Sequence, residues 1–337
     1  MSGDYESGDA SWVSGDFDGL NVAFGSYETY DDKLRGVKAS YGVSILARDA
    51  EKTRALERAV TGLQAIEDSL PYDHHKTVRT RIPVGVYNII ADFGQSRGGN
   101  TATILPNDPD HTRKYGRTIL LRYNIMTHPD IFANRKMRFD AVIDACCRDD
   151  LTTEGGFNRT LWHEIGHYLG VSKTADGREL GAALADYADL LEELKSDLVS
   201  LHAAPALKAS NYLNDESLQS LYADGIRRTL QIAQPRADQP YQNMQLMQFN
   251  FYSEHGLITP DPDSGLLRIS YERYPVVVNM LLEQVLQIQH AGDYDLAKQF
   301  VKRWNYWDES VHGMLAERML ETDAPRFTLV QFKVLQD

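Results

Sequence analysis

The sequence predicts a mainly α-helical protein with a smaller α+β part at its N-terminus. After about residue 152, apolar residues recur at helical spacing in nearly every segment. Segments rich in β-branched residues lie almost entirely before that point, and 337 residues are enough for one large domain or two lobes. We therefore expect an acidic tail at residues 1–16, a mixed α/β part at 17–150 and a helical part at 151–337, the last two sharing one compact core.

The N-terminal part opens with eight acidic residues before the first basic residue, Lys33. The first sixteen residues are rich in Gly, Ser and Asp, a composition that predicts disorder. The segments that follow are a strand, a helix, a strand, a turn-rich loop and a strand, because of their β-branched, helically spaced or turn-forming residues. In order, they are expected at residues 36–47, 49–69, 80–93, 94–110 and 117–126.

The C-terminal part is predicted to consist of seven helices. Their apolar residues follow the 3.6-residue period of a helix with one buried face. They are expected at residues 156–169, 182–203, 215–233, 242–255, 274–290, 294–304 and 309–320.

Composition excludes several classes of protein. There are 35 Lys and Arg against 48 Asp and Glu, a formal net charge of −13, whereas binders of nucleic-acid backbones depend on clustered basic residues. No apolar run approaches the ~20 residues of a membrane-spanning helix, and no secretory signal is visible. Cys146 and Cys147 are adjacent and cannot easily form an unstrained disulfide. We expect a cytoplasmic protein without nucleic-acid or membrane partners; its oligomeric state stays open.

The pentapeptide HEIGH at residues 163–167 carries the clearest chemical signal. His163 and His167 are four residues apart, so on a helix both imidazoles reach one metal ion, with Glu164 beside them. This spacing is typical of a zinc site with a built-in general base. Zinc lowers the pKa of a bound water from ~15.7 to about 7, and a carboxylate can then take its proton. Alone, the motif also fits two surface histidines beside a chance glutamate.

A third metal ligand is expected on the next helical segment, which carries a stripe of apolar residues. Asp186, Glu193 and Asp197 follow one flank of that stripe. Glu193 is the favoured ligand and Asp186 a weaker one, whereas Asp197 is placed to hydrogen-bond a metal-binding imidazole. Glu192 falls almost opposite the stripe and is predicted to face solvent. The alternative is a plain acidic amphipathic helix.

These motifs resemble the metal-binding region of the dipeptidyl peptidase III family. The resemblance is to the branch in which HExxH replaces the longer HExxGH, in some cases fused to Nudix hydrolases. It extends over about residues 17–260. The matching stretches, in order, are GSYETYDDKLRGVKASYGVSILARD, ATILPND, YGRTILLRYNIM, HEIGH, LLEELKSD and MQLMQFNFYSEHGLI.

The resemblance implies a gluzincin-like core, in which a HExxH helix and a Glu-bearing helix together bind one Zn²⁺. It assigns His163, His167 and Glu193 as ligands and Glu164 as the general base. The family's fold and chemistry then imply a peptide substrate.

Substrate contacts are also implied by the resemblance, at Glu28, Tyr30 and Asn107, with Tyr30 hydrogen bonding the oxyanion. Two departures concern this set. Residues 104–107 read Ile-Leu-Pro-Asn where the family often has Asn-x-Pro-Asn, and Tyr241 stands where the family has a histidine near the scissile carbonyl. Most of the N-terminal lobe of longer members is also missing from the match. The departures affect dipeptide-releasing specificity more than the metal site.

The leading functional hypothesis is a zinc hydrolase that cleaves an amide bond by metal-assisted attack of water, with Glu164 as base. Two alternatives stay open: a family member that binds zinc without peptidase activity, and a zinc enzyme that acts on a non-peptide small molecule.

Overall fold

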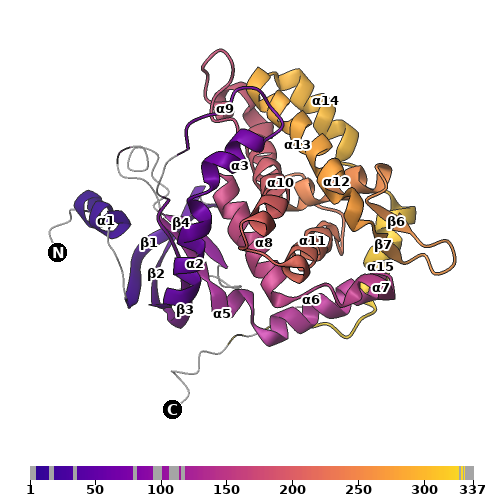
Figure 1. Cartoon of the computed structure of the whole chain (residues 1–337), viewed down its shortest axis with the longest axis horizontal. Coiled ribbons are helices and arrows are strands. Elements are labelled where there is room, and N and C mark those ends of the chain that lie inside the picture. The colour runs from indigo at the N-terminus through magenta and orange to yellow at the C-terminus, as the bar shows by residue number, and fades with distance from the viewer. Residues whose placement is uncertain are drawn as a thin grey trace. The chain divides into compact units, whose positions relative to one another are not determined.

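The computed structural model describes residues 5–14, 19–32, 36–78, 82–93, 101–105, 114, 118–325, 328 and 330. The chain divides into two compact units. We call residues 1–62, 79–128 and 329–337 the sheet unit, and residues 63–78 and 129–328 the helical unit. The prediction of a mainly α protein with a smaller α+β part is confirmed (Figure 1). Residues 63–78, which the sequence groups with the N-terminal part, pack in the helical unit.

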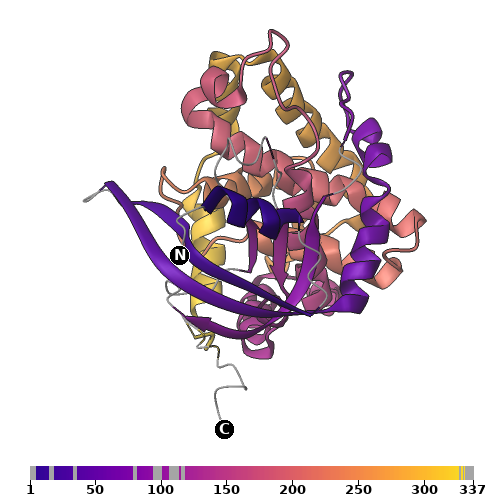
Figure 2. The same cartoon turned by 90° about the vertical axis from the view of Figure 1, so that its left-hand side faces the viewer.

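The sheet unit is built on five strands in the order β1-β2-β3-β5-β4. Only β3 and β5 are parallel neighbours; the other neighbours are antiparallel. Figure 2 shows β1 and β2 as a long curved pair. All five residues of β5 are buried, as expected of an apolar strand inside a sheet. The strands are β1 (Leu20–Asp32), β2 (Gly36–Arg48), β3 (Val84–Phe93), β4 (Ala102–Leu105) and β5 (Thr118–Arg122).

Among its described residues, the sheet unit also contains three short helices. They are α1 (Tyr5–Ser14), α2 (Ala50–Val60) and α5 (Tyr123–Met126). Helix α2 begins where the Asp49 carboxylate accepts a hydrogen bond from the Lys52 backbone N–H at 3.0 Å, a standard N-cap. Thr53 of α2 is fully buried, and its hydroxyl accepts the backbone N–H of Val86 in β3 at 3.1 Å.

The prediction of disorder for residues 1–16 is wrong for Tyr5–Ser14, which form α1. The indole of Trp12 donates to Oδ1 of Asn21 at 2.8 Å, and Val13 is buried. The Gly, Ser and Asp content gave no sign that these two apolar residues would find partners. Likewise β4 lies within the segment expected to be a turn-rich loop, because it completes the edge of the sheet beside β5.

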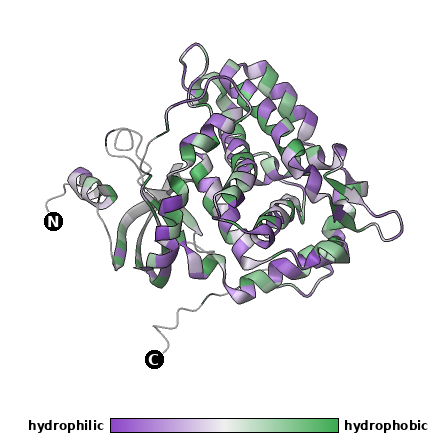
Figure 3. Cartoon of the chain, viewed as in Figure 1, coloured by the Kyte–Doolittle hydropathy of each residue, from purple (hydrophilic) through white to green (hydrophobic). Residues whose placement is uncertain are grey.

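The helical unit contains most of the helices that the sequence predicts. Figure 3 shows hydrophobic and hydrophilic residues alternating along them, as expected of helices with one buried face. Helix α6 and the β6–β7 hairpin were not predicted. The main elements are α3 (Leu63–Ser69), α6 (Pro129–Val142), α7 (Ala145–Arg148), α8 (Thr153–Gly166), α9 (Leu180–Leu184), α10 (Ala188–Ala209), α11 (Asp215–Thr229), α12 (Pro240–Glu254), β6 (Ile258–Pro260), β7 (Leu267–Ile269), α13 (Tyr274–Ala291), α14 (Tyr294–Trp304) and α15 (Met314–Leu320).

Helix α10 lies at the centre of this unit, in contact with α8, α11, α12 and α13 (Figure 1). Its residues from Leu194 to Leu201 are buried without interruption, so neighbours cover it on every side there. A Cβ added to Gly166 of α8 would lie 2.6 Å from the backbone oxygen of Ser196. Glycine at this position therefore lets α8 approach α10 closely, and this approach positions the site described next.

Candidate metal centre

Helix α8 presents the two histidines of the pentapeptide on one face. It begins at the Thr152 N-cap, whose hydroxyl accepts the Gly155 N–H at 3.2 Å. The rings of His163 and His167 lie 5.1 Å apart, centroid to centroid, and nearly perpendicular. The turn after the helix includes Gly170 with a φ of +78°, a left-handed conformation that favours glycine.

Helix α10 brings Glu193 to these histidines. Its Oε2 atom lies 3.1 Å from Nε2 of His163 and 3.8 Å from Nε2 of His167. One ligand atom from each of the three residues lies within 4.8 Å of the other two. The predicted third ligand and the two histidines are therefore close enough to share one cation.

The other ring nitrogen of each histidine faces a carboxylate. Nδ1 of His163 lies 3.1 Å from Asp197 Oδ1, and Nδ1 of His167 lies 3.0 Å from Glu192 Oε1. A carboxylate there accepts a hydrogen bond from the Nδ1–H group. This hydrogen bond fixes the ring orientation and leaves the Nε2 lone pair for a metal. Both rings thus direct Nε2 toward Glu193.

Asp197 is held in place from several sides. It is fully buried and forms an ion pair with Arg159, while Nε2 of Gln248 donates to its Oδ2 at 2.8 Å. Burial opposes ionisation, but the Arg159 charge and the hydrogen bond from His163 hold the pKa of Asp197 far below its ordinary value. Asp197 is therefore an ionised, oriented acceptor for His163.

Glu192 is not the solvated charge that was predicted: its side chain is 31% exposed, but neighbouring side chains engage its carboxylate. Besides His167, its carboxylate contacts Lys195 Nζ at 2.8 Å and Gln289 Nε2 at 3.4 Å. Burial opposes ionisation, yet Lys195 and His167 lower the pKa of Glu192 to about 2. The face of α10 opposite the predicted apolar stripe packs against other helices. Spacing along a single helix gave no sign of this packing.

The donor set suits a zinc ion. The Glu193 Oε2 atom is buried and has no hydrogen-bond partner among the described residues, which is unfavourable unless a cation lies beside it. Burial opposes charge on His163, but Asp197 and Glu193 raise the pKa of its ring to about 9; the same carboxylates would stabilise a metal dication. Two imidazoles and one carboxylate, with a position left open, form a ligand set of catalytic zinc sites.

Comparison with known proteins finds solved structures of similar fold. No model of a known protein family matches the chain. It is 26% identical to a dipeptidyl peptidase III structure from Caldithrix abyssi, with a TM-score of 0.83 over 94% of this chain and 62% of that one. A dipeptidyl-peptidase III structure from Corallococcus sp. strain EGB has 23% identity and a TM-score of 0.77, over 95% of this chain and 60% of that one.

The chain therefore resembles dipeptidyl peptidase III in fold. A curated relative, Nudix hydrolase 3 from Arabidopsis thaliana, is 24% identical over 319 residues, which are 90% of this chain and 40% of that protein. The dipeptidyl peptidase III-like chain therefore spans less than two thirds of the length of each of these relatives.

Two residues near the ligand set of the dipeptidyl peptidase III-like chain matter for its chemistry. Glu164 is partly buried and forms no hydrogen bond or ion pair with the rest of the described chain, so its carboxylate is free for a substrate or water. Tyr241 of α12 is 53% exposed, and burial of its hydroxyl and the Glu193 carboxylate raise its pKa. The Glu164 carboxylate is close enough to interact electrostatically with His163, and the Tyr241 hydroxyl with Glu193.

The remaining predicted site residues lie outside what the structure defines. Glu28 and Tyr30 are on β1, where their backbones pair with Ser40 and Lys38 of β2, but their side chains are not described. Asn107 lies outside the described residues. Their contacts with substrate stay predictions.

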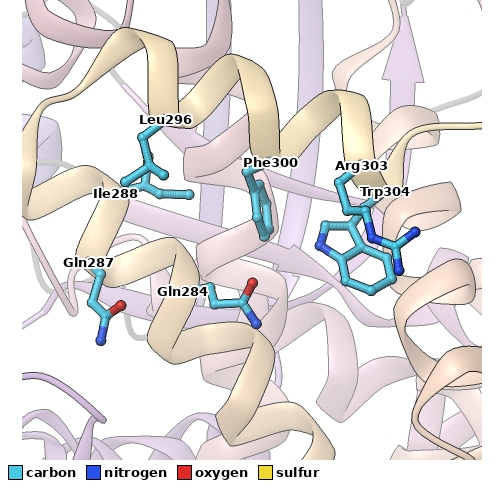
Figure 4. Close-up of a pocket in the computed structure, with 7 residues that line it drawn as sticks. All are labelled: Gln284, Gln287, Ile288, Leu296, Phe300, Arg303 and Trp304. Carbon is cyan, nitrogen blue, oxygen red and sulfur yellow. The ribbon is translucent and has the colours of Figure 1, made fainter.

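A hollow of about 350 Å³ also lies between α13 and α14, apart from the ligand set (Figure 4). Phe300 and Trp304 of α14 line it together with Gln284 and Gln287 of α13. Trp304 thus contributes to both the core and the hollow, since it lines the hollow and is only 6% exposed. Among the described residues, no helix is long and apolar enough to cross a bilayer.

Proposed function

We propose that this dipeptidyl peptidase III-like protein is a zinc-dependent hydrolase that cleaves an amide bond, with a peptide as substrate. The observation that carries the proposal is the convergence of two Nε2 atoms and the Glu193 Oε2 atom on one point. The carboxylates of Asp197 and Glu192 behind the two rings add to it. The likeness to dipeptidyl peptidase III structures supports the peptidase class.

His163, His167 and Glu193 would hold the ion. When bound, zinc supplies a Lewis acid for the substrate carbonyl and lowers the pKa of an adjacent water. Glu164 accepts the proton of the attacking water and passes it to the leaving amine. Its carboxylate suits this task because no hydrogen bond or ion pair within the described chain occupies it.

The surrounding residues keep this arrangement rigid. Asp197 and Glu192 hold the rings of His163 and His167, so that Nε2 needs no reorientation. Tyr241 stands beside Glu193 with its hydroxyl protonated, and it donates a hydrogen bond to the substrate carbonyl. Glu28, Tyr30 and Asn107 are proposed substrate contacts on the strength of the family resemblance, with Tyr30 as an oxyanion donor.

The replacement Glu164→Gln tests the proposal. It keeps the size of the side chain and removes the base, so we expect one bound zinc per chain and a loss of turnover of about 10²–10⁴-fold. Metal content is measured by elemental analysis and turnover with a broad peptide library. His163→Ala is the matched control and should lose the zinc. Turnover by Glu164→Gln at the native rate would show that the base is assigned wrongly.

A second candidate is a zinc-binding member of the family without peptidase activity. The observation that favours it is Tyr241, which replaces the family's histidine and lies beside the Glu193 carboxylate. Stoichiometric zinc without turnover of any peptide would support this candidate. Turnover of a metabolite but of no peptide would instead indicate a zinc enzyme for small molecules.

A further inference from the structure

A small cavity of about 200 Å³ lies in the helical unit, apart from the three metal-binding candidates. Three segments form it: the chain after α3, the turn after α8 and the end of α13. Its lining residues are Tyr72, His74, Lys76, Gly170, Val171, Ser172, Lys173 and His290. Its volume is below the ~300–1,000 Å³ typical of sites for organic ligands. The occupant that fits is a small ion.

The lining is basic, although the chain as a whole carries a net charge of −13. It includes two lysines and two histidines but neither aspartate nor glutamate. The rings of His74 and His290 stack with centroids 4.3 Å apart. Ring nitrogens from two segments distant in the sequence therefore meet at one side of the cavity.

Lys76 is the residue of the cavity that most needs a counter-charge. It is partly buried, and no described carboxylate lies within ion-pair distance of its Nζ atom. Burial and, after it, the Lys195 ammonium lower the pKa of Lys76 to about 8. An anion beside Nζ would relieve both effects.

The buried carboxylate that contacts the cavity lining is already occupied. Glu67 of α3 is fully buried, and its oxygens accept hydrogen bonds from the Tyr72 hydroxyl, the Lys76 backbone N–H at 3.2 Å and the Gly170 N–H at 2.7 Å. Lys173 forms an exposed ion pair with Glu179, a kind of pair worth little in water. Glu67 and Glu192 favour the charge of Lys76, but less than burial and Lys195 oppose it, so an anion beside Nζ would still stabilise the ammonium. Lys173 can turn to a ligand at small cost.

We propose that this cavity binds a small oxyanion of the phosphate class. A tetrahedral anion presents acceptor oxygens in several directions, matching the Lys76 and Lys173 ammonium groups, the two imidazoles and the Ser172 hydroxyl around it. Lysine binds phosphate as a point charge. The site is independent of the proposed hydrolase chemistry, because it uses none of the metal-binding residues.

Isothermal titration of the full chain with inorganic phosphate, at fixed pH and ionic strength, tests the proposal. We expect saturable binding of one phosphate per chain. Lys76→Met should weaken it at least tenfold. Lys298→Met, which removes an exposed lysine of α14 that lines no part of this cavity, should leave it unchanged. His74→Asn provides a second variant at an exposed position, where misfolding is not expected, and should weaken binding severalfold.

Glycerol 3-phosphate, titrated in parallel, distinguishes a site for the free ion from a site for a phosphomonoester. Saturable binding of inorganic phosphate or of glycerol 3-phosphate supports the site, and the compound that binds more tightly shows which of the two kinds of ligand the site prefers. Absence of saturable binding by both would overturn the proposal. Equal weakening by Lys76→Met and Lys298→Met would also overturn it, because the effect would then reflect net charge alone.

Discussion

Lys195 of α10 joins the end of the metal-binding helix to the residues behind His167. Its side chain is 1% exposed. The Nζ atom donates to the backbone oxygens of Gly166 and Leu169, each at 2.9 Å, and lies 2.8 Å from Glu192 Oε1. The three donors thus meet three acceptors: the carbonyl of Gly166 at the end of α8, the carbonyl of Leu169 in the turn that follows, and the Glu192 carboxylate.

Replacing Lys195 by Met keeps the length of the side chain and removes all three donors. Breaking a buried ion pair by removing one partner costs about 3–5 kcal/mol. Because the Glu192 side chain is 31% exposed and regains some hydration, we expect the lower end, about 3 kcal/mol. Glu192 would also hold the His167 ring less firmly, and losing a partner of this kind weakens metal binding by about 10–100-fold.

Urea denaturation of the zinc-free chain measures the first effect, and competition with a chromophoric chelator measures zinc affinity. Lys208→Met, on the same helix, is the matched control: Lys208 pairs with exposed Asp215, and such surface pairs contribute about 0–1 kcal/mol. The reasoning is refuted if the free energy of unfolding of Lys195→Met lies within about 1 kcal/mol of that of the native chain, the size of a surface-pair effect, and the variant binds zinc with native affinity.

Two further predictions concern the packing around the site. Gly166→Ala forces a Cβ to within 2.6 Å of Ser196 O, so it should destabilise the chain by about 1–3 kcal/mol and weaken zinc binding. Gly181→Ala, with open space around it, should do neither. Urea denaturation measures the stability of both variants, and chelator competition measures their zinc affinity. Buried Asp224 pairs with Arg227 and Arg228, which outweigh burial and hold its pKa far below the ordinary value. The ionised Asp224 carboxylate therefore stabilises the folded state fully above pH ~4, and this stabilisation is lost as the pH falls below that value. The difference in unfolding free energy between the native chain and Asp224→Asn should shrink from pH 6 to pH 3. A constant difference would contradict this.

Much of the fold followed from local pattern. The helix predicted at residues 294–304 has the bounds of α14, since its apolar spacing is strong and Asp293 caps its start. The helix expected at residues 274–290 is α13, which ends at Ala291, just before Gly292 adopts a φ of +60°. By contrast, β4 and α1 depend on partners elsewhere in the sheet unit, Leu121 and Asn21 among them, and composition alone pointed to a loop and a disordered tail.

For the site, the sequence by itself determined which residues share a face. The four-residue spacing of His163 and His167, and the flank occupied by Glu193 and Asp197, are properties of a single helix, whose period is fixed by its backbone. The tertiary structure alone decided the use of Glu192. Neighbouring helices pack around α10. The Glu192 side chain, predicted to be hydrated, therefore pairs with His167 and Lys195 although it stays 31% exposed.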